Sequence, residues 1–302
     1  QGLPQSQGAT GIQDAEGYIW VGTMEGLGRY NGTSFTTYSS REGIGNGRIW
    51  ELLLARDSTL YAATGSGVAI WRNHRWNALP IKDLEGIRCR ALAEDAAGNI
   101  WIGSDTGVFS GRESNFRKAA AADLKGQEYV YDLLPDQGAM LAVTSTGLWR
   151  IDSRGHRTAI PGPPVGKANY RCAGMTPEGL WLGSYAQGLW LQEPDGWKRI
   201  PAGEVPAESF WRMEQGPSGT FYIATNGSGL YLRRPGSASF EHWSEANGLP
   251  SNVVNCAYED LERNLWIGTD IGGLARLGGK GVSNHGVRQG LPSPCVFGIT
   301  AG

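Results

Sequence analysis

Short apolar segments recur along the chain at a nearly constant spacing. There are seven of them, centred on positions 20, 61, 101, 141, 181, 222 and 266, and each ends in Ser or Thr. A Gly followed by a hydrophobic residue comes three or four positions after each of these Ser or Thr residues. The chain therefore consists of seven copies of one unit, spaced 40 to 44 residues apart.

Within one copy the pattern predicts four short strands. In the third copy, residues 89–95 form an apolar stretch that leads into an Asp- and Gly-containing turn. Residues 100–102 are continuously apolar, which is typical of a strand buried on both faces. In the first copy, the segments 27–30 and 34–38 flank an Asn-Gly pair, which favours a tight hairpin, and only the last segment alternates as an exposed outer strand does.

A repeated unit of four strands and this length predicts an all-β fold, a seven-bladed β-propeller with four antiparallel strands per blade and the first strand innermost. Helical solenoids are excluded because no segment carries apolar residues at helical spacing over 11 residues. The predicted blades are approximately residues 1–42, 43–83, 84–123, 124–163, 164–204, 205–246 and 247–288.

The two ends of the chain open with the same four residues, Gln-Gly-Leu-Pro, at positions 1–4 and 289–292. Residues 289–302 therefore start an eighth copy. Either its segment 295–300 replaces the Gly-rich segment 6–12 as innermost strand of blade one, or the tail leads to another repeat outside the ring. Because segment 295–300 has more strand-forming residues, we expect the two ends to meet in blade one. The lack of an initiating Met and of a signal peptide indicates a processed product or an excised piece.

Composition and charge exclude several classes of protein. The 302 residues include 40% apolar side chains and carry a net charge of only −2, so the chain can bury a large core and is not a disordered tail. The sequence has no basic block, which gives no electrostatic reason to expect nucleic acid as a partner. It also has no apolar run of the roughly 18 residues needed to insert into a membrane.

Three strings resemble the two-component regulator propeller repeat family: Asp-Ala-Ala-Gly-Asn-Ile-Trp-Ile-Gly-Ser at 95–104, Asn-Leu-Trp-Ile-Gly-Thr at 264–269, and Asn-Gly-Leu-Pro-Ser-Asn-Val-Val at 247–254. Copies two and four depart from the pattern, with Ala63 and Val143 where the family has Gly. The resemblance implies a seven-bladed propeller from the periplasmic sensor region of a bacterial hybrid histidine kinase or diguanylate cyclase. It therefore implies a role in signal transduction, and it leaves the output domain open.

The sequence contains no catalytic constellation, and we predict no cofactor and no metal site. The four His residues fall in outer-strand regions of different blades, and the Cys residues of the first strands are expected to be small buried hydrophobes. An enzyme remains an alternative, because propellers host lyases and glycosidases that use carboxylates near the axis. The candidate carboxylates lie on first strands: Glu51, Glu128, Asp132, Glu208 and Glu214.

The channel mouth is the predicted binding site, since the starts of the first strands and the hairpins after the Ser or Thr residues reach the same face. The candidate residues there are Arg48, Trp50, Arg88, Tyr129, Tyr170, Tyr185, Trp211 and Asn252. Successive residues of a strand face opposite ways, so part of this set is expected in blade interfaces. Arginine, aromatic and amide side chains suit a small polar ligand with apolar faces, such as a carbohydrate, or a protein partner. A third alternative is a purely structural repeat protein that binds itself.

Overall fold

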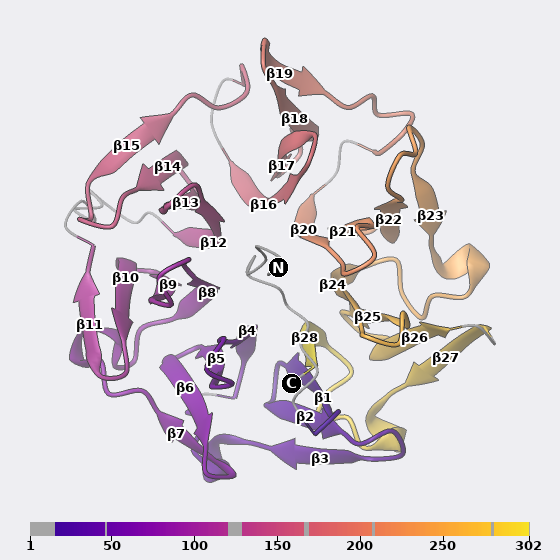
Figure 1. Cartoon of the computed structure of the whole chain (residues 1–302). Helices are drawn as coiled ribbons and strands as arrows, with labels where there is room; N and C mark the ends of the chain where they lie inside the picture. Colours follow the sequence, from indigo (N-terminus) through magenta and orange to yellow (C-terminus); the bar gives the residue numbers. More distant parts are fainter. Residues whose placement is uncertain are drawn as a thin grey trace.

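The computed structural model describes residues 16–45, 47–119, 129–165, 169–206, 209–278 and 281–301. Seven antiparallel sheets surround a central channel, so the fold is the all-β, seven-bladed propeller that the sequence predicts (Figure 1). Six blades have four strands that are consecutive in the sequence. The first blade combines a strand from the C-terminal end of the chain with three from the N-terminal end.

The strands of each blade run in order from the channel outward. Blade one contains β28 (Val296–Ala301), β1 (Ile19–Thr23), β2 (Leu27–Tyr30) and β3 (Phe35–Tyr38). Blades two and three contain β4 (Ile49–Leu54), β5 (Leu60–Thr64), β6 (Gly67–Arg72), β7 (Arg75–Ala78), β8 (Cys89–Glu94), β9 (Ile100–Ser104), β10 (Gly107–Arg112) and β11 (Asn115–Lys118). Blades four and five contain β12 (Val130–Asp136), β13 (Ala139–Thr144), β14 (Gly147–Ile151), β15 (Arg157–Ile160), β16 (Tyr170–Thr176), β17 (Gly179–Ser184), β18 (Leu189–Glu193) and β19 (Gly196–Arg199). Blades six and seven contain β20 (Phe210–Gln215), β21 (Phe221–Thr225), β22 (Leu230–Arg233), β23 (Glu241–Trp243), β24 (Val254–Glu259), β25 (Leu265–Thr269), β26 (Leu274–Gly278) and β27 (Gly281–His285).

Helical structure in the described residues is limited to single 3-10 turns between blades. They are η1 (Ser40–Glu42), η2 (Lys82–Leu84), η3 (Glu245–Asn247) and η4 (Val287–Gln289). No helix in this part of the chain has the length and apolar character needed to cross a membrane.

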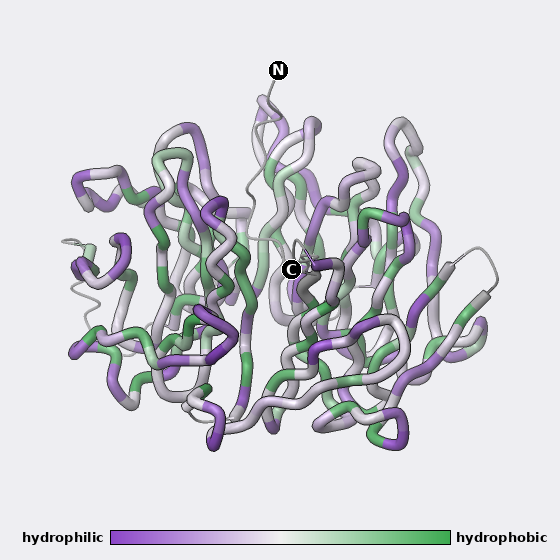
Figure 2. Tube along the Cα trace, turned by 60° about the horizontal axis from the view of Figure 1, so that its bottom comes forward, coloured by the Kyte–Doolittle hydropathy of each residue, from purple (hydrophilic) through white to green (hydrophobic). Residues whose placement is uncertain are grey.

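The core lies between the blades. Seven hydrophobic clusters each join two neighbouring blades, as when Ala63 of β5 packs with Cys89 of β8. Second strands such as β5 and β9 are buried at every residue because each has another sheet on both of its faces. Figure 2 shows the hydrophobic stretches inside the ring, with hydrophilic residues concentrated in the loops that project from it.

The repeated Ser or Thr closes the hairpin between the second and third strands. In all seven blades its hydroxyl group donates a hydrogen bond of 2.7 to 3.0 Å to the carbonyl oxygen of the Gly that begins or directly precedes the next strand. These Gly residues have positive φ angles, for example 119° at Gly67, which a residue with a Cβ adopts only with strain. The hairpin geometry therefore explains why the Ser or Thr and the Gly recur together.

The Gly that precedes the Ser or Thr in four blades lets neighbouring blades approach closely. A Cβ on Gly103 of β9 would lie 2.6 Å from Cγ1 of Val130, the first residue of the next innermost strand. A Cβ on Gly268 would lie 2.5 Å from Cγ1 of Val296 in the same way. Larger residues stand at this position in blades two, four and six, where Ala63, Val143 and Ala224 fill the space themselves.

The Asp of the family motif organises the hairpin between the first and second strands. Asp95 accepts hydrogen bonds from the backbone and side-chain nitrogens of Asn99 and from the indole nitrogen of Trp101, at 2.8 to 2.9 Å. Asp260 does the same for Asn264 and Trp266. One carboxylate thus fixes the turn and orients a large core side chain.

The tail of the chain closes the ring. β28 pairs antiparallel with β1, with Val21 opposite Ile299, and it occupies the innermost position of blade one. Ile299 and Val296 are fully buried in the cluster that joins blades seven and one. The two ends of the chain therefore meet in blade one; the segment 6–12 lies outside the described residues.

Replacing Ile299 by Ala is expected to lower the free energy of unfolding by about 2 to 4 kcal/mol, because it leaves a cavity at the seam that joins the two ends of the chain. Urea unfolding followed by tryptophan fluorescence measures this loss. Val282→Ala, on the outermost strand of blade seven and 36% exposed, is the control and is expected to change stability by less than about 1 kcal/mol. Equal effects of the two substitutions would contradict a closing role for β28.

Replacing Gly103 by Ala is expected to cost about 1 to 3 kcal/mol, because the added methyl group would force Val130 and blade four away from blade three. Gly203→Ala is the matched control, since no atom outside the neighbouring residues lies within 4 Å of the position its Cβ would take. Urea unfolding of both variants separates close approach of the blades from a general effect of removing Gly. A Gly103→Ala protein as stable as the Gly203→Ala protein would refute this explanation.

Candidate functional site

Each innermost strand begins with a β-bulge. In blade two, Ile49 pairs with Thr64 and Glu51 pairs with Ala63, so Trp50 between them has no partner in the ladder. The same shift of register occurs at the corresponding position in every blade. The skipped residues, one per blade, are Phe297, Trp50, Arg90, Tyr131, Arg171, Trp211 and Asn255, and we call them the bulge ring.

The bulge ring lines one cavity of about 220 Å³ at the end of the channel where the innermost strands begin. A bulge changes the direction in which a strand presents its side chains, and here it presents one side chain per blade to the axis. The residue before each bulge is buried, for example Ile49 and Phe210. Arg48, Asp132 and Arg212 complete the lining.

Arginine and aromatic side chains stack on one another around part of this mouth. The guanidinium carbon of Arg48 lies 3.7 Å from the ring centroid of Trp50 and 4.6 Å from that of Phe297. That of Arg90 lies 4.7 Å from the Trp50 ring, and that of Arg171 lies 4.4 Å from the Tyr131 ring. Such contacts hold a guanidinium group flat against a π face while leaving its edge for other partners.

Three nitrogen atoms of the lining residues are buried without a hydrogen-bond partner among the described residues. They are Nε of Arg48, Nε1 of Trp50 and Nε of Arg171. Buried donors in native proteins are almost always hydrogen-bonded, so these donors suit an acceptor supplied from outside the chain. Arg90 differs, because its Nε donates to Asp105 at 2.8 Å.

An ion pair across the channel forms the floor of the cavity. Nη2 of Arg212, from blade six, lies 2.9 Å from Oε1 of Glu51, from blade two. Oε2 of Glu51 accepts a hydrogen bond of 2.9 Å from the backbone nitrogen of Leu92 in blade three. Asp132 accepts one of 3.0 Å from the backbone nitrogen of Ala173. The floor therefore ties together blades on opposite sides of the ring.

Burial and crowding of like charges perturb the acid groups of this floor. Burial raises the pKa of Glu51 to about 8; the Arg212 guanidinium opposes this shift, and Asp132 and Glu214 add to it. Burial also raises the pKa of Asp132. The pKa of Arg212 is raised although burial alone would lower it, because Glu51 and Asp132 hold its positive charge.

The structure brings together most of the residues predicted for the channel mouth. Arg48, Trp50 and Trp211 line the cavity. Arg88, Tyr129 and Tyr185 lie beside it: the guanidinium carbons of Arg88, Arg90 and Arg171 are 5.7, 5.2 and 5.7 Å from the rings of Trp50, Tyr129 and Tyr185, respectively.

Two predicted residues lie elsewhere. Tyr170 is 3% exposed and packs in the cluster between blades four and five, because it is the residue before a bulge. Asn252 instead holds the 3-10 turn η3: its backbone nitrogen donates to Oε1 of Glu245 and its Oδ1 accepts from the backbone nitrogen of Glu245. Arg171, next to Tyr170, and Asn255, three positions after Asn252, line the cavity in their place.

Among the carboxylates considered for catalysis, Glu51 and Asp132 converge on Arg212, and Glu214 also contributes to its pKa. The other two, Glu128 and Glu208, lie outside the described residues. No group of three potential metal ligands is present in the described part of the chain.

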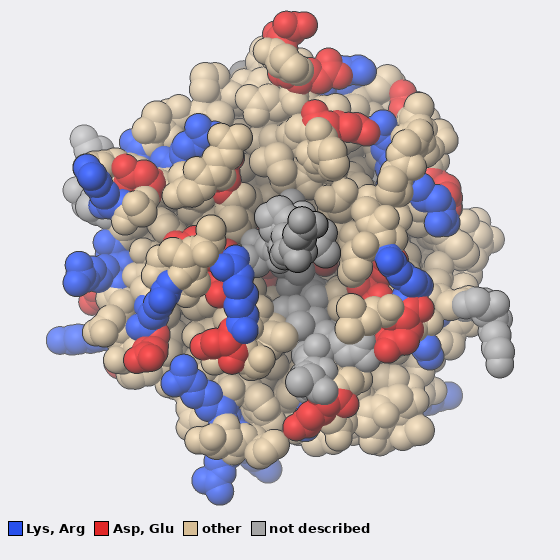
Figure 3. Space-filling view, in the orientation of Figure 1, with Lys and Arg blue, Asp and Glu red and all other residues tan. Residues whose placement is uncertain are grey.

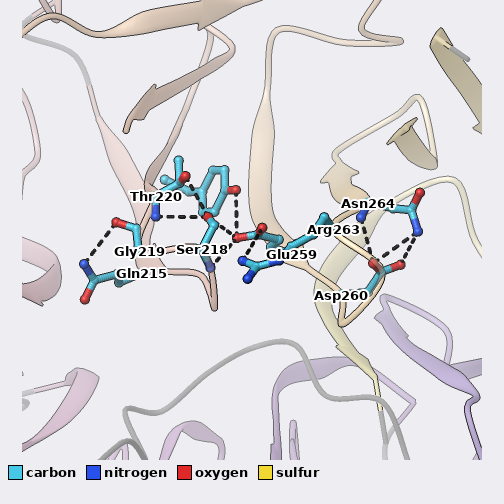
Figure 4. A network of polar contacts seen from close by, with 9 residues as sticks. Gln215, Ser218, Gly219, Thr220, Glu259, Asp260, Arg263 and Asn264 are labelled. Atoms are coloured by element: carbon cyan, nitrogen blue, oxygen red, sulfur yellow. Dashed lines mark hydrogen bonds and ion pairs between the residues drawn. The ribbon is translucent and has the colours of Figure 1, made fainter. Parts of the chain in front are cut away.

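The cleft between blades six and seven, at the opposite end of the ring, differs chemically from the mouth. Between blades six and seven, Glu259 accepts hydrogen bonds from the backbone nitrogen and the hydroxyl group of Ser218 and pairs with Arg263 (Figure 4). Arg234 in the same cleft pairs with Glu241. These charges are neutralised within the chain, so we take the cleft as a structural contact between blades. On the face drawn in Figure 3, basic and acidic side chains of the described residues are interspersed.

Comparison with known proteins gives matches to the repeat sequence and to the fold. Residues 83–106 and 248–270 match the family model of the two component regulator propeller. Both segments contain the innermost strand, the Asp turn and the buried second strand of a blade. No curated protein matches the chain.

Several solved structures share the fold at low identity. The extracellular domain assigned to a hybrid two component system of B. thetaiotaomicron matches with a TM-score of 0.70 and 14% identity, over 95% of this chain and 47% of that chain. Virginiamycin B lyase from Staphylococcus aureus matches with a TM-score of 0.64 and 14% identity, over 88% of this chain and 92% of that chain. An ancestral GH74 enzyme matches with a TM-score of 0.66 and 14% identity, over 93% of this chain and 48% of that chain. The chain thus spans about half the length of the first of these.

Replacing Glu51 by Gln is expected to flatten the dependence of stability on pH between about 5 and 8. A carboxyl group whose pKa is raised in the folded state stabilises that state at low pH, and this contribution is lost as the pH rises through its folded pKa of about 8. Urea midpoints of the wild type should therefore fall over this range more steeply than those of the variant.

Glu85→Gln, at an exposed position, is the control and should keep the wild-type slope. Wild-type and Glu51→Gln proteins with the same slope would show that Glu51 is already ionised at pH 5 in the folded state.

Proposed function

We propose, from the premise that the chain is built of two-component regulator propeller repeats, that it is the ligand-binding propeller of an extracytoplasmic bacterial signalling receptor. Its ligand is a small polar molecule with apolar faces, such as a carbohydrate fragment, and it binds in the cavity at the channel mouth. The chain provides binding, and the signal is passed on by other parts of the receptor.

The observation that carries the proposal is the bulge ring. Seven blades each contribute one side chain to the same cavity, and those side chains are aromatic, guanidinium or amide groups. Aromatic faces cover the apolar faces of sugar rings, while Arg and Asn bind hydroxyl and carboxylate groups. Trp211 is 42% exposed, which is unusual for Trp and leaves its ring available to a ligand.

Two further observations support the proposal. The solved structure of a hybrid two component system that shares this fold is an extracellular domain, and the propeller is part of a longer chain there. In addition, the floor carboxylates that an enzyme of the lyase or glycosidase type would use are engaged with Arg212 and with backbone nitrogens.

Saccharides that bind at the mouth are expected to raise the melting temperature of the wild-type protein, because they bind only the folded state. In a thermal-shift screen with mono- and disaccharides, Trp211→Ala should reduce this shift to less than about half, since it removes one aromatic wall of the cavity. Leu261→Ala, at a position 70% exposed in a hairpin away from the mouth, is the control and should leave the shift unchanged.

Chromatography of the same mixtures detects conversion of the saccharide. Stabilisation without conversion supports binding, whereas release of a product would favour the enzyme alternative. A screen in which no saccharide stabilises the protein would count against the proposed function and favour a partner protein or self-association.

A further inference from the structure

We infer that the ligand is an acidic saccharide whose carboxylate or sulfate groups bind Arg48 and Arg171. This inference rests on the proposed function and adds the charge of the ligand and the residues that recognise it. It follows from the arginines of this region, of which some form ion pairs with carboxylates of the chain and others do not.

The arginines of this region fall into two groups. Arg212 on the floor pairs with Glu51, and Arg90 pairs with Asp105. Arg48 and Arg171, in contrast, form no ion pair with any described residue, and the Nε atom of each is buried without an acceptor. The mouth therefore holds two guanidinium groups without an ion-pair partner in the described chain, and Asp270 acts on Arg48 only from beyond ion-pair distance.

Stacking prepares these two side chains for an anion. Arg48 lies against the rings of Trp50 and Phe297, and Arg171 lies against Tyr131. A guanidinium group held by its face presents its N–H groups along its edge, which is the geometry that binds a carboxylate or sulfate with two hydrogen bonds. Burial lowers the pKa of Arg48; Arg88 and Arg90 add to this shift, and Cys295 and Asp270 oppose it. An anion at this place would relieve the crowding of the three cations.

The remaining walls define the other part of the ligand. Blades six and seven, which follow blade five of Arg171 around the ring, contribute Trp211 and Asn255, an aromatic face and an amide group. The floor below offers an anion no free cation, because Glu51 and Asp132 both act on the single guanidinium group of Arg212. An anionic group is therefore favoured at the level of the arginines and disfavoured at the floor, and a sugar ring can face Trp211.

The test compares sugars that differ only in charge, on the full chain. Glucuronate and galacturonate, as monosaccharides and as disaccharides, are titrated by calorimetry alongside glucose and galactose and their neutral disaccharides, at low and high salt. We expect the uronates to bind about tenfold or more tightly than the neutral sugars, and their affinity to fall as salt increases.

Arg48→Gln and Arg171→Gln should each weaken the binding of the uronate disaccharides by about tenfold, and each should reduce the dependence of that binding on salt. Arg48→Lys keeps the charge but not the planar fork, and should recover only part of the affinity. Arg117→Gln, on the exposed outermost strand of blade three, is the matched control and should bind like the wild type. Circular dichroism of each variant verifies that it is folded, and the two Gln variants test the inference independently.

Neutral sugars that bind as tightly as uronates would overturn this inference and leave the proposed function standing. Uronate binding that survives both Gln substitutions would overturn it as well, because the arginines would not hold the anion. Absence of binding by every saccharide would count against the proposed function itself, and the inference would fall with it.

Discussion

The pairing of β28 with β1 is the interaction on which the rest of this ring depends. Six blades are built from consecutive strands, but the first has its innermost strand only because residues from the other end of the chain supply it. That strand buries Val296 and Ile299 against blade seven and places Phe297 in the cavity. Closure therefore completes the fold and the candidate site in one step: Phe297, next to Arg48, is both part of the seam and part of the mouth.

The repeat separates positions that hold the fold from positions that are free to carry function. The residue before each bulge is buried, the Ser or Thr opposite it closes a hairpin, and in four blades a Gly next to that Ser or Thr lets the blades approach. None of these constraints applies to the skipped residue, because it has no partner in the ladder and faces the channel. Its identity changes from blade to blade, from Trp50 to Arg90 to Asn255, while the residue before it is buried in every blade. The same backbone can thus present many different surfaces at the mouth.

The regular spacing of the seven copies made the fold predictable, and the starts of the first strands located the mouth. The β-bulge in each innermost strand could not be predicted in this way. With regular alternation there is no reason to prefer Arg171 over Tyr170, and Tyr170 lies outside the cavity. Asn252 lies outside it because it precedes β24 and holds the turn η3, so that Asn255 is the bulge residue of that blade. A shift of one residue in a ladder depends on hydrogen bonds to the next strand, which leave no mark in a short apolar run. The ion pair of the floor could not be predicted from the sequence for another reason. Arg212 and Glu51 are 161 positions apart, and only closure of the ring brings them together.

Floor and mouth use arginine in opposite ways, and the difference follows from what surrounds each guanidinium group. Arg212 is buried among carboxylates, so its charge is neutralised inside the chain and the pair connects opposite blades. Burying a charge away from water is costly unless a partner of opposite charge is present, and the floor contains that partner. Arg48 and Arg171 rest on aromatic faces, which attract a cation but do not cancel its charge. A cation held in this way keeps most of its attraction for an anion, and for this reason the stacked arginines, and not the floor, give the cavity its preference for a negatively charged ligand.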